Sequence, residues 1–282
     1  MEKFALPKRK KDTHKGTYGH LFVIGGSPGL TGAVCLASMA ALRTGCGLVT
    51  AGVPESLNEI FEIKLTEAMT MPLPESGRKT IGILAVEKCL RFIEKIDGVV
   101  IGPGISTDPG TEEFFRQILP EIKKPVIIDA DGLKLLSKNT EILKNSERKI
   151  ILTPHPGEMS YLTGLTVAEI QQNRKKVAFD FAGKFNVVLV LKGYRTVITD
   201  GKNVYVNSTG NPGMATGGSG DVLSGIIGSL AVQGFSLWES AVTGTYLHGL
   251  AGDLAARKIG EYSLIATDII EFLPQAIKKI QR

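Results

Sequence analysis

Residues 187–191 read VVLVL, five consecutive apolar residues of which three are β-branched. A short run without polar residues is typical of a strand that is covered on both faces. Residues 126–128, VII, have the same character. Strands of this kind occur mainly in parallel sheets that lie between two layers of helices. The two runs therefore favour an α/β fold.

Further strands and helices alternate along the chain on both sides of these runs. The predicted strands are residues 20–24, 48–53, 98–102, 126–129, 150–153, 187–191, 196–199 and 204–207. The predicted helices are residues 31–44, 85–96, 111–119, 167–184, 221–232, 237–257 and 266–280. This order predicts an α/β fold with a mainly parallel central sheet and helices on both faces. The last two strands depart from it, because Asp200-Gly201 predicts a tight hairpin.

No linker, internal repeat or low-complexity segment divides the 282 residues, so one domain is favoured over two. Residues 14–282 are the expected domain, and residues 1–13 are an expected basic N-terminal arm. The run KRKK at residues 8–11 is interpreted as a solvated terminus rather than a nucleic-acid signal.

The composition excludes a disordered chain, since 43% of the residues are hydrophobic and 22% are charged. The net charge of +5 is compatible with small anionic ligands and too weak to indicate nucleic acid. Cys35, Cys46 and Cys89 form no C-x-x-C pair and are interpreted as structural thiols. The longest nearly apolar run, residues 222–232, is too short for a bilayer, and no signal peptide is visible after Met1. We expect a cytoplasmic protein without nucleic-acid or membrane partners.

The strongest functional signal is NPGMATGGSGD, residues 211–221, followed by an apolar helix. Its glycines allow positive φ angles and expose backbone N–H groups, and the helix start adds unpaired N–H donors with a partial positive charge. Such a segment binds phosphate. The predicted anion hole consists of Gly217, Gly218, Ser219 and Gly220.

Asp221 follows this loop directly. A carboxylate beside a phosphate site accepts the proton of an attacking hydroxyl during phosphoryl transfer. The alternative is that Asp221 only caps the helix. The glycines before it favour the catalytic interpretation.

Other glycine-rich or polar segments follow predicted strands. Residues 25–33, GGSPGLTGA, lack the dinucleotide fingerprint and indicate either a close approach to a ligand or a tight turn. Residues 102–104, GPG, are a weak loop signal at a strand end, where open α/β sheets bind ligands. Residues 153–159, TPHPGEM, hold a histidine between two prolines, which favours a ligand contact over a structural role. Residues 192–196, KGYRT, fit a nucleotide-binding turn or a solvated hairpin corner equally well.

Metal ligands are weakly indicated. Asp129 and Asp131 offer paired carboxylates at a strand end, for Mg²⁺ or for capping the next helix. The four histidines are scattered, and no His/Cys metal cluster is present. A zinc function is therefore not favoured, and the metal ligands stay unassigned.

Taken together, these motifs resemble those of the ADP- or ATP-dependent NAD(P)H-hydrate dehydratases of the ribokinase-like superfamily. GGSGD resembles the G-x-G-D anion-hole loop of that superfamily. The resembling segments, in family order, are residues 14–16, 25–33, 102–104, 153–158, 192–193 and 211–221. The resemblance implies a ribokinase-like fold and a single catalytic domain over residues 14–282, without the additional epimerase domain of some relatives.

The resemblance also implies an activity. It is the nucleotide-dependent dehydration of the S form of hydrated NADH or NADPH back to NAD(P)H, a carbon–oxygen lyase reaction of nicotinamide-nucleotide repair. ADP is the expected co-substrate, giving AMP and phosphate, with ATP as the alternative and Mg²⁺ as cofactor. A vitamin-precursor kinase of the same superfamily and a nucleotide-binding sensor without turnover are the competing hypotheses.

Site residues follow from the same resemblance. The implied hydrate-binding residues are Ala33, Gly104, His155 and Asp221. The implied nucleotide-binding residues are Lys192, Gly193, Tyr194, Arg195, Thr196 and Gly220. A homo-oligomer, for example a tetramer, is expected.

Overall fold

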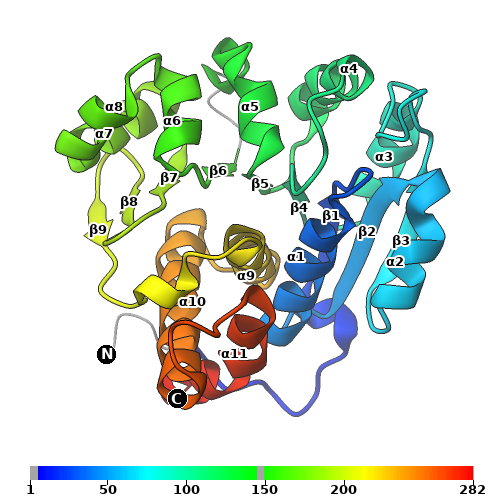
Figure 1. The fold of residues 1–282 in the computed structure, drawn as a ribbon. Coiled ribbons are helices and arrows are strands. Elements are labelled where there is room, and N and C mark those ends of the chain that lie inside the picture. Colours follow the sequence, from blue (N-terminus) through cyan, green and yellow to red (C-terminus); the bar gives the residue numbers. More distant parts are fainter. Residues whose placement is uncertain (1–5, 145–148, 282) are drawn as a thin grey trace.

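A computed structural model describes residues 6–144 and 149–281. Its strands form one nine-stranded sheet in the order β3-β2-β1-β4-β5-β6-β7-β8-β9 (Figure 1). Their bounds are β1 His20–Ile24, β2 Leu48–Pro54, β3 Met69–Leu73, β4 Gly98–Ile101, β5 Val126–Ile128, β6 Ile150–Leu152, β7 Val188–Leu191, β8 Val197–Thr199 and β9 Val204–Val206. Every pair from β3 to β7 is parallel, whereas β8 and β9 are antiparallel to their neighbours. The mainly parallel sheet and the terminal hairpin are confirmed.

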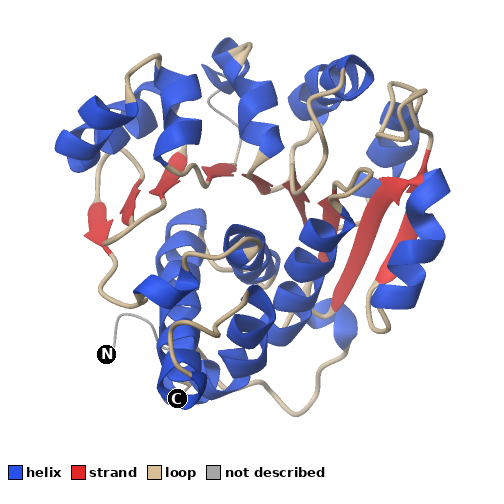
Figure 2. Ribbon diagram, in the orientation of Figure 1, coloured by secondary structure: helices blue, strands red, loops and turns tan. Residues whose placement is uncertain are grey.

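Helices cover both faces of this sheet, as Figure 2 shows. One face carries α3 Ala85–Ile93, α4 Pro109–Ile118, α5 Asp131–Ser137, α6 Pro156–Thr163, α7 Val167–Gln172 and α8 Arg174–Phe185. The other carries α1 Thr31–Thr44, α2 Asn58–Lys64, α9 Ser219–Val232 and α10 Leu237–Ile259, with α11 Ala266–Ile280 packed outside them. Short 3₁₀ turns are η2 Lys15–Tyr18, η3 Glu55–Leu57, η4 Leu119–Glu121, η5 Thr140–Lys144 and η6 Pro212–Met214.

The core follows from the alternation of side chains along the strands. Phe22 and Ile24 of β1 are buried under the α3–α8 layer, while Leu21 and Val23 between them are buried under the other. Successive side chains of a strand point to opposite faces, so a run that is apolar at every position packs against both layers. α9 is buried on nearly all sides because it lies between the sheet and α10 and α11.

The structure corrects several predicted elements. β3 and α2 are absent from the sequence prediction. β3 is an edge strand that contains Pro72 and buries only Leu73, and α2 is only seven residues long. α5 and α6 were also missed, being only seven and eight residues long. The helix predicted over residues 167–184 is two helices, since the backbone of Asn173 leaves the helical region with φ −132° and ψ 39°. The helix predicted over residues 85–96 ends at Ile93.

The predicted basic arm is described from Leu6 onward, and its residues 1–5 lie outside the described chain. The Leu6 amide donates to the carbonyl of Ile280, 3.1 Å away, which joins the start of the arm to the end of α11. The Arg9 guanidinium lies 3.7 Å from the centre of the Tyr18 ring and donates to the Gly45 carbonyl. Arg9 is thus anchored, while its neighbours in the basic run are exposed as expected.

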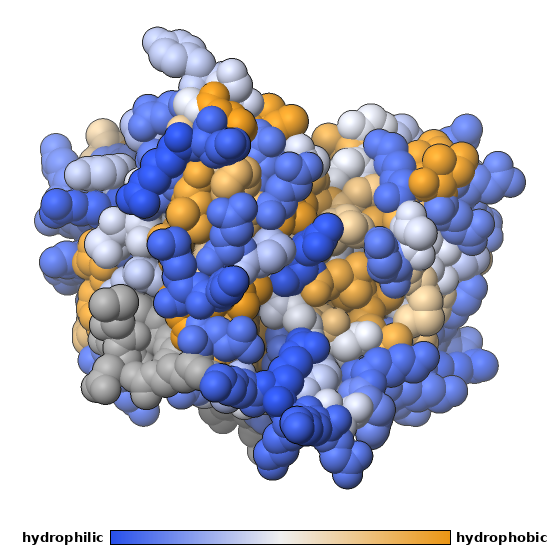
Figure 3. Space-filling view, turned by 90° about the horizontal axis from the view of Figure 1, so that it is seen from below, coloured by the Kyte–Doolittle hydropathy of each residue, from blue (hydrophilic) through white to orange (hydrophobic). Residues whose placement is uncertain are grey.

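Among the described residues, no helix is both long enough and apolar enough to cross a bilayer. Figure 3 views the molecule from below, and its apolar areas are interrupted by hydrophilic side chains. This view identifies no contact surface for a second copy of the chain, so the expected homo-oligomer stays a prediction.

Candidate functional site

The functional segments meet where the parallel strands end. Loops leave β1, β4, β5, β6 and β7 at their carboxyl ends, which lie along the same edge of the sheet. The amino end of α9 faces this edge. A Cβ atom added to Gly220 would lie 3.3 Å from Nζ of Lys192 and 3.9 Å from Oδ2 of Asp129. The glycine loop is therefore in contact with groups that follow β5 and β7.

Within the glycine loop, residues 211–221, Gly218 alone has the positive φ that the sequence predicts for its glycines. Gly218 is the N-cap of α9 and has a left-handed backbone with φ 89°. A Cβ atom there would lie only 2.4 Å from a terminal carbon of Leu36, whereas around Gly217 nothing lies within 4 Å. Since the first N–H groups of a helix have no partner within it, those of Gly220 and Asp221 are available to an anion.

Asp221 is the third residue of α9, so the N-cap alternative is wrong. Burial raises the pKa of its carboxyl to about 7, and the neighbouring Asp129 and Glu158 add to the shift. Lys192 opposes them without cancelling the effect. A carboxyl with a pKa near neutrality suits a general base, because it is ionised in part and still accepts a proton readily.

Lys192 holds two buried carboxylates together beneath the loop. Its Nζ lies 2.7 Å from Oδ1 of Asp129 and 3.5 Å from Oε2 of Glu158, and the Asp129 side chain is only 1% exposed. Burial alone would lower the pKa of Lys192, but the two carboxylates outweigh it and hold that pKa above its usual value. Burial also raises the pKa of Glu158, against the pull of Lys192. The ammonium is thus the counter-charge for both acids.

His155 forms the N-cap of α6 and is half exposed. Its Nδ1 accepts hydrogen bonds from the amides of Gly157, at 3.0 Å, and Glu158, at 3.2 Å. Oε2 of Glu158 accepts in return from the His155 amide at 2.7 Å. Burial and the nearby Lys192 lower the pKa of His155. The ring is therefore mainly neutral at pH 7. Its Nε2 lies 3.5 Å from Oε1 of Glu158, and about half of the side chain is exposed to a ligand.

Ala33 and Gly104 lie side by side, although 71 residues separate them. A Cβ atom on Gly104, where φ is 60°, would lie 3.3 Å from Cβ of Ala33 and 2.6 Å from the carbonyl oxygen of Leu30. The hydroxyl of Ser27 donates to the Gly104 carbonyl at 2.8 Å. The loops after β1 and β4 therefore interlock, and only glycine fits at residue 104.

The turn at residues 192–196 leaves Tyr194 almost fully exposed. Thr196 closes it by donating from Oγ1 to the carbonyl of Gly193 at 2.9 Å. Arg174, at the start of α8, donates to the carbonyl oxygens of Leu191 at 2.8 Å and Lys192 at 3.2 Å. No sequence pattern marks Arg174, because its partners are backbone carbonyls at the end of β7. Residues 14–16, by contrast, precede β1 and lie at the opposite end of the sheet.

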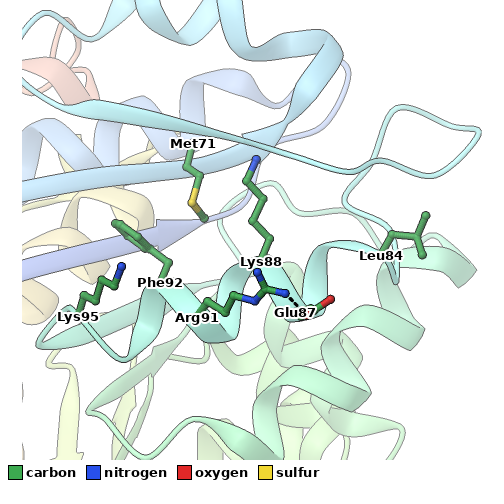
Figure 4. Close-up of a pocket in the computed structure, with 7 residues that line it drawn as sticks. All are labelled: Met71, Leu84, Glu87, Lys88, Arg91, Phe92 and Lys95. Atoms are coloured by element: carbon green, nitrogen blue, oxygen red, sulfur yellow. Dashed lines mark hydrogen bonds and ion pairs between the residues drawn. The ribbon is translucent and has the colours of Figure 1, made fainter.

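Two cavities in the described part of the chain differ in whether they include a predicted segment. One of about 450 Å³ lies between β3 and α3, where Met71 and Phe92 form its apolar part and Lys88 and Arg91 its basic part (Figure 4). It contains no predicted site residue. The other, about 400 Å³, is lined by Asn211 at the start of the glycine loop and by residues of α10 and the following segment.

The family model of NAD(P)H-hydrate dehydratase matches residues 21–275. A bifunctional NAD(P)H-hydrate repair enzyme of Moorella thermoacetica is 47% identical over 98% of this chain and 52% of its own length. An ADP-dependent (S)-NAD(P)H-hydrate dehydratase of Neisseria meningitidis serogroup B is 40% identical over 89% of this chain and 82% of its own. The chain thus spans about half the length of the bifunctional relatives it matches.

Solved structures agree with this match. An ADP/ATP-dependent NAD(P)H-hydrate dehydratase from Bacillus subtilis, co-crystallised with ATP and Mg²⁺, has a TM-score of 0.84 and 30% identity, covering 99% of this chain and 95% of its own. A ribokinase-like superfamily protein from Enterococcus faecalis also has a TM-score of 0.84, with 27% identity over 99% of this chain and 93% of its own. The ribokinase-like fold is confirmed, and a family model that matches most of the chain leaves one conclusion: this chain belongs to the NAD(P)H-hydrate dehydratase family.

Proposed function

We propose that the protein dehydrates the S form of hydrated NADH or NADPH to NAD(P)H and uses ADP, which it converts to AMP and phosphate. The observation that carries the proposal is the amino end of α9, where free amides adjoin both the Asp221 carboxyl and the buried Lys192 ammonium. Such a site binds a phosphoryl group and offers a base to the hydroxyl that attacks it. The family match disfavours the vitamin-precursor kinase alternative.

The chemistry takes two steps. The hydroxyl on the hydrated nicotinamide ring attacks the terminal phosphoryl group of the nucleotide, and Asp221 takes its proton. The phosphoanhydride bond breaks, and the rest of the nucleotide leaves, as AMP when ADP is the donor. The amides of Gly217, Gly218, Ser219 and Gly220 stabilise the charge on the phosphoryl oxygens, at roughly 3–4 kcal/mol per donor by analogy with oxyanion holes. The carbon–oxygen bond then breaks, phosphate departs, and a proton leaves the neighbouring ring carbon to restore the double bond.

The residues implied by the family are retained as proposed contacts. Ala33, Gly104, His155 and Asp221 are proposed to bind the hydrate. The proximity of Ala33 to Gly104 and the exposed ring of His155 support this assignment. The nucleotide is proposed to contact the five residues of the turn at 192–196 and Gly220, which lies beside Lys192.

Magnesium is proposed as the cofactor. In the described residues, no three His, Cys, Asp or Glu side chains are grouped as a complete metal site. The carboxylates at the site still fit Mg²⁺, because phosphoryl-transfer sites bind this ion through one or two carboxylates together with the phosphates. Asp129, which also contacts the Lys192 ammonium, would supply one carboxylate here. The second sequence candidate, Asp131, is the first residue of α5 and pairs with Lys134 at 2.8 Å. When bound, Mg²⁺ neutralises phosphate oxygens.

The test supplies purified protein with hydrated NADH or NADPH, Mg²⁺ and either ADP or ATP, and follows the recovery of NAD(P)H absorbance. Recovery with ADP supports the proposal, and recovery with ATP alone would change the co-substrate. A stable phosphorylated product would favour a kinase, and nucleotide binding without turnover would favour a sensor. Light scattering would test the proposed homo-oligomer, for example a tetramer. Cell fractionation would test the proposed cytoplasmic location.

A further inference from the structure

The segment that leads into the glycine loop is attached along its length to α10. Oγ1 of Thr209 donates to the carbonyl of Tyr246 at 2.9 Å. The Gly210 amide and the Asn211 side-chain amide each donate to a different carboxylate oxygen of Asp253, both at 3.0 Å. At the loop itself, the Ser219 hydroxyl contacts the His248 side chain of α10.

Two glycines of α10 allow this close attachment. A Cβ atom on Gly249 would lie 2.2 Å from Oγ1 of Thr209, and one on Gly252 would lie 2.3 Å from Sδ of Met214. Positions 245, 248, 249, 252 and 253 recur at the helical spacing of three or four, so they share one face of α10. This face of α10 therefore contacts the segment that leads into the glycine loop.

His248 lies on the same face. Its Nε2 is 3.2 Å from Oγ of Ser219, and both side chains are buried, at 9% and 8% exposure. Ser219 sits between Gly218 and Gly220, two of the four residues whose amides are proposed to bind phosphate. A hydrogen bond to Ser219 therefore acts in the middle of the loop, where a small shift would move the donors.

We propose that His248 is a positioning residue, which holds Ser219 and thereby fixes the phosphate-binding amides of Gly218 and Gly220. The inference rests on the proposed function of this loop. Burial, aided by the nearby Lys192 and opposed by a hydrogen bond to the Ser219 backbone, lowers the pKa of His248 to about 4. The ring is thus uncharged at neutral pH, so its contribution is a geometric one and not a charge offered to the phosphate.

The chain offers a matched control. Nε2 of His20 lies 2.8 Å from Oγ1 of Thr50, so it also joins a histidine ring to a hydroxyl on another element. This pair lies near the start of β1, at the end of the sheet opposite the site. The variants to compare are H248A, H248Q, S219A, the double variant H248A/S219A, H20A and H20Q.

For H248A we expect kcat to fall roughly 10- to 100-fold, because misplaced donors lose most in the transition state. KM for the nucleotide should change less than about threefold. H248Q, whose amide reaches a similar place, should recover part of kcat, and adding S219A to H248A should cost little more. A loss of kcat in H248A no larger than in H20A, or full additivity with S219A, would overturn the proposal.

Hydrogen exchange by mass spectrometry separates this inference from the proposed function. The amides of residues 213–221 should exchange faster in H248A than in the wild type. Their exchange rate in H20A should equal that of the wild type. If the wild type shows no dehydratase activity, the proposed function fails, and the positioning role is then decided by this exchange alone. Unchanged loop exchange in H248A would overturn the positioning role whatever the activity.

Discussion

Replacing Lys192 by methionine removes the counter-charge of two buried carboxylates while keeping an unbranched apolar stem. Asp129 and Glu158 are 1% and 6% exposed as side chains, and Lys192 is 17% exposed, so water cannot replace the lost ammonium fully. Removing one partner of a buried ion pair typically costs about 3–5 kcal/mol. At about 2–4 °C per kcal/mol for a domain of this size, K192M should melt roughly 6–20 °C below the wild type.

The loss should depend on pH. The folded-state pKa of Glu158 is already raised by burial, and Lys192 is the group that restrains it. Without Lys192 that pKa rises further, so between the unfolded value of about 4.3 and the new folded value the folded state binds more protons than the unfolded one. Stability then falls as pH rises, and the deficit of K192M should be larger at about pH 8 than at about pH 5.

Urea unfolding of both proteins at the two pH values measures this deficit. The control is K138M, which removes the exposed ion pair between Lys138 and Glu112 and should cost less than about 1 kcal/mol at either pH. A deficit of K192M below about 1 kcal/mol, or one that is equal at the two pH values, would refute the idea that Lys192 compensates buried carboxylates.

Three further outcomes concern the glycine loop and its acid. D221N should lower kcat by about 10²–10⁴-fold, because the amide cannot take the proton, and should change nucleotide affinity little. Absorbance recovery measures kcat, and calorimetry measures the affinity. Equal losses of kcat and affinity would contradict the role of Asp221 as a base. Since the pKa of Asp221 is about 7 and only the ionised form accepts a proton, kcat/KM should rise with pH up to about that value and then level off. A pH profile that is flat from acid to neutral would speak against this assignment. G218A should destabilise the protein by about 1–2 kcal/mol in urea unfolding, because of the left-handed backbone and the contact with Leu36, while G217A should stay within about 0.5 kcal/mol. Similar losses in both variants would show that the backbone at Gly218 is not the cause.

The sequence alone determined the class of fold and marked the loop that we propose binds phosphate. Apolar runs such as residues 187–191 have no polar side chain to offer water, so they are stable only between two layers of helices. The glycines before Asp221 act through their own backbone, which is a local property. Edge strand β3 escaped prediction because most of its side chains are not fully buried and leave no pattern.

Tertiary structure decided which side chains meet. Lys192 pairs with Asp129 from 63 residues away, and His248 meets Ser219 from 29. The sequence marked Lys192 and Asp129 only as separate strand ends and gave His248 no role. Local preferences fix the backbone of each segment, whereas the order and register of strands β4 to β7 and the packing of α10 on α9 fix the neighbours of each side chain. The pKa values at the site arise from those neighbours and from burial, so they exist only in the folded chain.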